Sequence, residues 1–284
     1  IDTPGHVDFT VEVERSLRVL DGAIVILCGV GGVEAQSETV WRQADRYQVP
    51  RIVYINKMDR IGVNPENAVN ELKEKLGAKP LIIQMPLGRE ENFRGVIDLV
   101  EMKEINWGDD ILGTKYDVGD VSCEYREEAE AKRIEIIEQL SDLDDKMMER
   151  YLKEDEILSE EIREVIRKGT ISLHFVPVLY GASFKNKGVH SLLDAIVDYL
   201  PSPADMPSVK GQHPKTLDVE ERKASDEEPL SGLVFKTMND PYVGTLAFIR
   251  VYSGKAKVGT SIFNSSKDKE ERSMRFLQMH SNKR

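Results

Sequence analysis

Ala-Ile-Val-Ile-Leu-Cys at residues 23–28 and Arg-Ile-Val-Tyr-Ile-Asn at residues 51–56 decide the fold. Both runs are apolar without alternation, which predicts strands that are buried on both faces, as in a parallel sheet. Residues 34–47 between them have a helix-forming composition without Gly or Pro, so the three segments indicate a strand–helix–strand unit. A third strand is predicted at 175–180, followed by a helix at 189–199 that two prolines close.

A long segment, from about 64 to 172, separates the second predicted strand from the third and is expected to be an inserted α+β subdomain. We expect a helix at 64–76, strands at 81–85 and 94–100, and one long helix from about 125 to 152. The apolar residues of the long helix recur at steps of three and four and predict a single buried stripe beside a charged face. The stripe consists of Ile134, Ile137, Leu140, Met147 and Tyr151.

The end of the chain predicts a second domain. Residues 203–228 are rich in Pro, Ser and charge and are expected to be a linker. Residues 229–284 hold short alternating runs punctuated by Gly, which are typical of part of a β-barrel. The predicted fold is therefore α/β over residues 1–202, with an incomplete Rossmann-like sheet, its insertion, and a partial β-barrel domain after it.

Composition sets broad limits on function. The 284 residues carry 39 basic and 50 acidic side chains, a net charge of −11, and 40% hydrophobic residues, which is ordinary for a globular protein. The acidic balance disfavours nucleic-acid binding by the surface as a whole, although a local basic patch is compatible with it. No apolar run is long enough for a membrane span. Two cysteines, Cys28 and Cys123, are expected to be free thiols in a reducing compartment.

The strongest chemical signal is Asn56-Lys57-Met58-Asp59, directly after a predicted buried strand. A carboxylate such as Asp59 can accept hydrogen bonds from both N1–H and the 2-amino group of guanine, which adenine cannot offer. Asn56 can tether neighbouring loops, and the stem of Lys57 can lie along the base. The alternative is a plain turn after a strand.

A second motif, Asp2-Thr3-Pro4-Gly5-His6, stands at the start of the chain. Asp2 can hold Mg²⁺ through a water molecule, and Gly5 lets a backbone N–H approach a γ-phosphate. His6 can orient an attacking water molecule. Taken alone, a Pro-Gly turn with an incidental histidine explains these residues equally well.

A third loop, Gly181-Ala182-Ser183-Phe184-Lys185, follows the third predicted strand, and its backbone N–H groups can reach the O6 atom of guanine. The carboxyl ends of parallel strands meet at one edge of a sheet, where ligands bind. Three such loops in this order therefore predict a guanine-nucleotide site.

Residues 2–59, from Asp-Thr-Pro-Gly-His-Val-Asp-Phe to Asn-Lys-Met-Asp, closely resemble the translational GTPases, elongation factor G above all. The inserted segment resembles the subdomain that elongation factor G carries within its G domain. The match is weakest at 204–228. Further stretches that resemble the family are 184–189, 198–203, 240–246, 250–254 and 277–280.

The resemblance implies a P-loop GTPase sheet, GTP or GDP with Mg²⁺ as cofactors, and a role for each matching residue. His6 would position the hydrolytic water, and Asp2 would join the Mg²⁺ shell through water. Ala182-Ser183 stands where Ser-Ala is usual, so a Ser hydroxyl bracing Asp59 is in doubt. The implied nucleotide-binding residues are Asp2, Thr3, Pro4, Gly5, His6, Asn56, Lys57, Met58, Asp59, Ala182, Ser183 and Phe184.

The family also implies the ribosome as partner. A stalk protein would contact the acidic helix predicted at about 125–152, and small-subunit RNA would contact the β-domain. Charge patterning alone favours a solvated face for that helix, and basic residues on an exposed strand also protect an edge. A monomer with no membrane contact is expected, in the cytoplasm or an organellar matrix.

No G-x-x-x-x-G-K-[ST] sequence occurs in these residues, so we expect this chain alone to bind GTP weakly or not at all and to hydrolyse none. A sheet without the strand that leads into that loop should expose apolar edges. The leading interpretation is a translocation GTPase. The alternatives are a recycling or ribosome-protection paralogue, a non-catalytic ribosome-binding module, and an unrelated α/β nucleotide binder.

Overall fold

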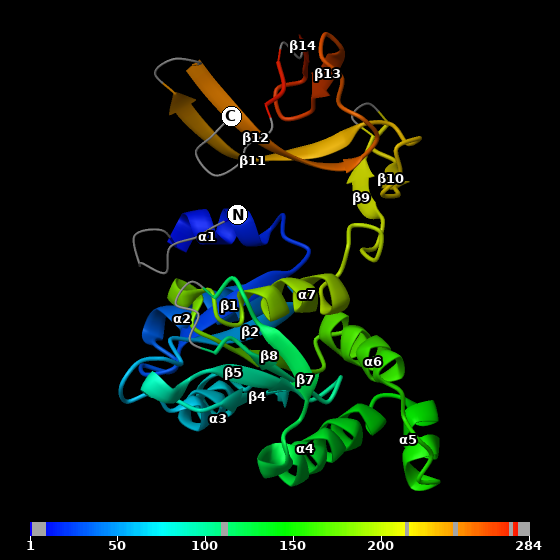
Figure 1. Ribbon diagram of the computed structural model, residues 1–284. Helices are drawn as coiled ribbons and strands as arrows, with labels where there is room; N and C mark the ends of the chain where they lie inside the picture. The colour runs from blue at the N-terminus through cyan, green and yellow to red at the C-terminus, as the bar shows by residue number, and fades with distance from the viewer. Residues whose placement is uncertain (2–9, 109–112, 214–215, 241–243, 273–274, 278–284) are drawn as a thin grey trace. The chain divides into compact units, whose positions relative to one another are not determined.

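The computed structural model describes residues 1, 10–108, 113–213, 216–240, 244–272 and 275–277. The chain divides into two compact units, Ile1–Pro201 and Ser202–Arg284 (Figure 1).

The first unit is built on a four-stranded parallel sheet in the order β1-β2-β8-β3. The predicted strands at 23–28, 51–56 and 175–180 are confirmed, as are the helices at 34–47, 64–76 and 189–199, each within one residue at either end. The strands are β1 (Ala23–Cys28), β2 (Arg51–Asn56), β8 (Val176–Tyr180) and β3 (Pro80–Ile82), and the helices beside them are α1 (Thr10–Leu17), α2 (Ala35–Arg46), α3 (Pro65–Leu76) and α7 (Val189–Tyr199).

Strand β2 lies inside the sheet and is covered on both faces. Ile52 and Tyr54 pack into the apolar cluster that includes residues of α7, whereas Val53 and Ile55 pack into the cluster that includes residues of α3. Figure 1 shows these two helices on opposite sides of the sheet. The same second cluster contains Trp107, which is 2% exposed. Because β2 is held from both sides, its last residues have a fixed place at the carboxyl edge.

The expectation that β1 is buried on both faces is wrong. Ile24 is 38% exposed and Ile26 is 60% exposed, whereas Leu27 is only 1% exposed. β1 is an edge strand of the described sheet, and no described element buries the face that carries Ile24 and Ile26. Exposed apolar surface at this end of the sheet agrees with the sequence-based expectation.

The run at 81–85 was expected to be one strand of the insertion, and this is wrong. β3 joins the parallel sheet beside β8, and β4 (Gln84–Leu87) starts a separate antiparallel sheet. Ile83 lies between them, donating its N–H to the carbonyl of Val178 and accepting from the N–H of Leu99. The insertion therefore begins later than residue 64, because α3 and β3 together form a strand-to-strand crossover of the main sheet.

The inserted sheet has the order β4-β5-β6-β7. Its other strands are β5 (Gly95–Asp98), which corresponds to the predicted strand at 94–100, β6 (Lys103–Asn106) and β7 (Asp117–Asp120), with the short 3₁₀ helix η2 (Glu90–Asn92) between β4 and β5. Three helices follow, α4 (Cys123–Ser141), α5 (Asp145–Leu152) and α6 (Ser159–Ile171).

The single helix predicted at 125–152 is wrong, because it is two helices. The side chain of Asp144 accepts a hydrogen bond from the N–H of Met147 at 3.2 Å and so caps the start of α5. The predicted stripe is confirmed at Ile137, Leu140 and Met147, which are buried. It is wrong at Ile134, which is 47% exposed, and it missed Ile136, which is 2% exposed.

The second unit consists of antiparallel hairpins. The expected linker at 203–228 contains one of them, and its Lys210 pairs with Glu221 across the strands at 2.9 Å. Residues 229–284 contribute two more, which agrees with the expected β-rich domain. The strands are β9 (Val209–Gln212), β10 (Val219–Arg222), β11 (Ser231–Asp240), β12 (Gly244–Ser253), β13 (Ser261–Asn264) and β14 (Lys269–Arg272).

Across the described part of the chain, no helix is both long enough and apolar enough to cross a bilayer. The two cysteines, Cys28 and Cys123, are free thiols, as expected.

Candidate nucleotide-binding site

Two of the three predicted loops lie side by side. β2 ends at Asn56 and β8 ends at Tyr180, and these strands are parallel neighbours, so the loops that follow them leave the same edge of the sheet. The loops are also bonded to each other, because the N–H of Met58 donates to the carbonyl of Gly181 at 3.1 Å and the N–H of Gly181 donates to the carbonyl of Ile55 at 3.0 Å. The structure therefore brings residues 56–59 and 182–184 together.

Asn56 ties the two loops through its side-chain amide. Its Nδ2 donates to the hydroxyl of Ser183 at 2.8 Å, and its Oδ1 accepts from the backbone N–H of Ser183 at 2.9 Å. The same Oδ1 accepts from the N–H of Lys57 at 2.8 Å. One amide thus fixes the separation of the loops, and the Ser183 hydroxyl is in contact with Asn56 and not with Asp59.

Lys57 has a backbone φ of +65°, in the left-handed region that side-chain-bearing residues seldom adopt. The bond from its N–H to Asn56 and the buried Met58 beside it hold this conformation. Met58 is 0% exposed and packs in one cluster with Phe93 and Ala182. The turn after β2 is therefore anchored by a core residue and leaves Lys57 at the surface.

Asp59 faces Lys185 across the two loops. Its Oδ2 lies 3.0 Å from the Nζ of Lys185, and the aspartate side chain is 15% exposed. A largely buried carboxylate held by a cation is an ordered acceptor for two N–H donors. Lys185 was not among the predicted site residues, although it is adjacent to them in the sequence.

Ala182 and Phe184 take opposite positions in the second loop. Ala182 is 1% exposed, whereas Phe184 is fully exposed and presents an aromatic face to solvent. A short 3₁₀ helix, η3 (Ser183–Lys185), carries Phe184, and Asn186 follows it with a φ of +55°. The N–H of Ala182 donates to the carbonyl of Lys187 at 2.9 Å and closes the loop on itself.

Cys28, at the end of β1, joins the same edge of the sheet. Burial raises the pKa of its thiol, but the backbone N–H groups of Gly31 and Val30, together with Lys57, outweigh this and leave the pKa below its usual value. Sequence reasoning treated Cys28 as an ordinary free thiol. Its contact with Lys57 could not be read from the sequence, because it depends on how β1 and β2 pair.

The predicted motif at the start of the chain, Asp2, Thr3, Pro4, Gly5 and His6, lies outside the described residues. The structure therefore places seven of the twelve predicted nucleotide-binding residues, namely Asn56, Lys57, Met58, Asp59, Ala182, Ser183 and Phe184.

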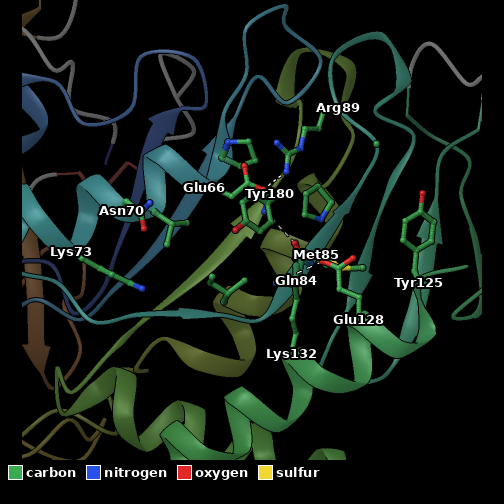
Figure 2. Close-up of a pocket in the computed structure, with 15 residues that line it drawn as sticks. Glu66, Asn70, Lys73, Gln84, Met85, Arg89, Tyr125, Glu128, Lys132 and Tyr180 are labelled. Carbon is green, nitrogen blue, oxygen red and sulfur yellow. Dashed lines mark hydrogen bonds and ion pairs between the residues drawn. The ribbon is translucent and has the colours of Figure 1, made fainter.

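A separate pocket of ≈ 290 Å³ opens between α3 and α4 (Figure 2). Figure 2 shows the ring of Tyr180 among its lining residues, with Arg89 paired to Glu66 above it. Gln84 also lines the pocket, and its Oε1 accepts from the N–H of Tyr180 at 3.2 Å. The lining does not include residues 56–59 or 182–184, so this pocket is distinct from the predicted base site.

Comparison with known proteins agrees with this geometry. The family model for the elongation factor Tu GTP-binding domain matches residues 1–202, and the model for elongation factor G domain 2 matches residues 229–284. The chain is also similar to a crystal structure of a protein from Thermus thermophilus, with 26% sequence identity and a TM-score of 0.77. That match covers 96% of this chain and 37% of the Thermus chain.

Proposed function

This chain belongs to the elongation factor G-like translational GTPases, and from that premise we propose that it recognises guanine in a factor whose GTP hydrolysis drives movement of tRNA and mRNA through the ribosome. The observation that carries the proposal is the pairing of two loops at the carboxyl edge of β2 and β8, with Asn56 bonded across them. Ligands bind at this edge in open α/β sheets.

In this proposal Asp59 specifies guanine. Its carboxylate accepts from N1–H and from the 2-amino group of the base, which adenine cannot match. Lys57 lies along one side of the base with its aliphatic stem, and the exposed ring of Phe184 offers a stacking surface. The N–H groups of Ala182 and Ser183 donate to Lys187 and Asn56, so in this proposal the backbone N–H of Phe184 faces the O6 atom. The side chains present fit a purine base with a donor pair at positions 1 and 2.

The phosphate and metal roles rest on the resemblance. Asp2 would hold Mg²⁺ through water, Gly5 would approach the γ-phosphate, and His6 would position the attacking water, with Thr3 and Pro4 shaping the turn. Mg²⁺ would supply charge neutralisation at the phosphates. The ribosome, including its stalk protein and small-subunit RNA, is the proposed partner, and a monomer in the cytoplasm is the proposed state.

The test replaces Asp59 by Asn in the full-length protein. The variant should lose GDP affinity on the order of 100-fold or more, because the 2-amino and N1–H donors of guanine then face an amide that donates as well as accepts. Xanthosine diphosphate, which has a carbonyl at position 2, should gain affinity in the same variant. Both dissociation constants are measured by displacement of a fluorescent nucleotide.

Asp155→Asn is the matched control, because Asp155 is exposed and distant from β2 in the sequence. It should bind both nucleotides like the unmodified protein. If Asp59→Asn binds GDP normally and gains nothing for xanthosine diphosphate, residues 56–59 are a turn and not a base-recognition loop.

A further inference from the structure

Glu90, in the short helix η2 of the insertion, holds the turn that follows β2. Its backbone N–H donates to the carbonyl of Met58 at 2.9 Å. Its side-chain Oε1 accepts from the N–H of Gly62 at 2.7 Å. The two contacts lie on either side of Asp59 in the sequence, so one residue of the insertion fixes both flanks of the proposed base-recognition turn.

The backbone at Glu90 is in an uncommon conformation. Its φ is +56°, in the left-handed region, where a non-glycine residue costs roughly 1–2 kcal/mol. Gly88 precedes it with a φ of +76°, and a Cβ at Gly88 would lie 2.1 Å from the carbonyl oxygen of Asn92. Uncommon backbone conformations of this kind persist only where surrounding contacts hold them. Here the contacts are the hydrogen bonds of Glu90 with Met58 and Gly62.

The same segment, residues 88–93, reaches the second loop as well. Phe93 is 3% exposed and packs in the cluster that holds Met58 and Ala182. The carbonyl of Phe93 accepts from the Nζ of Lys187, which follows the 182–184 turn, at 3.3 Å. Segment 88–93 therefore contacts both loops of the site. Among the described contacts, it touches neither Asp59 nor Ser183.

We propose that Glu90 is a positioning residue for guanine recognition, through which the inserted subdomain sets the orientation of Asp59. This inference rests on the proposed function, because it requires that Asp59 binds the base. It adds that guanine affinity depends on the insertion. The insertion is joined to the site by hydrogen bonds that span 28 and 32 residues of sequence.

The experiment compares Glu90→Ala, Glu90→Gln and Glu91→Ala in the full-length protein. Affinities for GDP, for ADP and for inosine diphosphate, which lacks the 2-amino group, are measured for each variant, together with its thermal melting temperature. Glu90→Ala should weaken GDP binding about 3- to 10-fold, the effect of one hydrogen bond. Inosine diphosphate should lose less, so the preference for GDP over it should shrink.

Glu90→Gln should restore that preference, because its amide oxygen still accepts from the N–H of Gly62. Glu91→Ala is the matched control, since Glu91 is the next residue, has the same charge and is exposed. It should leave both affinities unchanged. If Glu90→Ala proves too unstable to assay, Glu90→Asp replaces it, because the shorter side chain falls short of Gly62 and should reduce the preference in the same way.

An unchanged GDP preference in a folded Glu90→Ala or Glu90→Asp variant would overturn the inference, and so would a Glu90→Gln variant as defective as Ala. The unmodified protein and Glu91→Ala separate this result from the proposed function. If they bind ADP as well as GDP, the proposed function fails. If they prefer GDP and the Glu90 variants do so equally, only the role of Glu90 fails.

Discussion

At the scale of single residues, the site depends on the side-chain amide of Asn56, which bonds to both Ser183 and Lys57. Sequence reasoning expected Asn56 to tether neighbouring loops, and the structure shows it bonded to Ser183. This much could be predicted, because loops after adjacent parallel strands must meet at one edge. Glu90 could not be predicted, because no local motif marks it and its contacts lie across the fold of the insertion. Lys185 was also missed as the partner of Asp59.

Asn56→Ala should lower the free energy of unfolding by about 1 kcal/mol, because the N–H groups of Ser183 and Lys57 lose their acceptor. The site is solvent-exposed, so water replaces part of the loss. Ser183→Ala should cost less, about 0.5 kcal/mol, since it removes the hydroxyl contact and keeps both N–H bonds. Urea denaturation followed by circular dichroism measures the free energy of unfolding of both variants. Equal losses would contradict the larger contribution of the bonds from the two backbone N–H groups to Asn56.

At the scale of elements, periodicity predicted the existence of helices better than their ends. The apolar spacing continued from 125 to 152, yet the chain breaks at Asp142–Asp144, where short acidic side chains favour caps over helix interiors. Burial on β1 was overpredicted, because Ile24 and Ile26 have strand composition whether or not an element covers them. The hairpin of β9 and β10 was not predicted, because the Pro- and Ser-rich composition around it indicates a linker.

Asp144→Ala should lower the free energy of unfolding by about 1 kcal/mol at pH 7 through loss of the α5 cap together with the exposed ion pair to Lys168. Hydrogen bonding to Lys168 lowers the pKa of Asp144, and the N–H groups of Met147 and Lys146 add to this. A carboxyl whose folded pKa lies below its unfolded pKa stabilises the fold above the unfolded value and loses this effect as pH falls through the folded one. The difference from the unmodified protein should therefore shrink below about pH 4.

The control for this cap is Asp145→Ala. Asp145 is exposed, lies in the first turn of α5 and has the same charge. Urea unfolding of both variants at pH 7 and pH 3 is the measurement. A loss at Asp145 as large as that at Asp144, or a difference for Asp144 that persists at pH 3, would contradict the cap.

At the scale of the whole molecule, the division into two units at Pro201 and Ser202 has a direct test. Residues 201–208 form no helix or strand and are mostly exposed, so brief digestion by subtilisin should cut there first. Trypsin should not, because this stretch contains neither Lys nor Arg. Mass spectrometry of the first products measures the position, and early cuts within β2 or β8 would contradict the division.

The buried indole of Trp107 gives the protein an optical reporter of its own. The sequence has two tryptophans, Trp41 and Trp107, and both belong to the apolar cluster that contains Met58 and Ala182. Replacing Trp41 by Phe leaves one fluorophore, whose emission responds to the packing beneath both loops. A change in that packing can then be followed in real time, in dilute solution and without an attached dye.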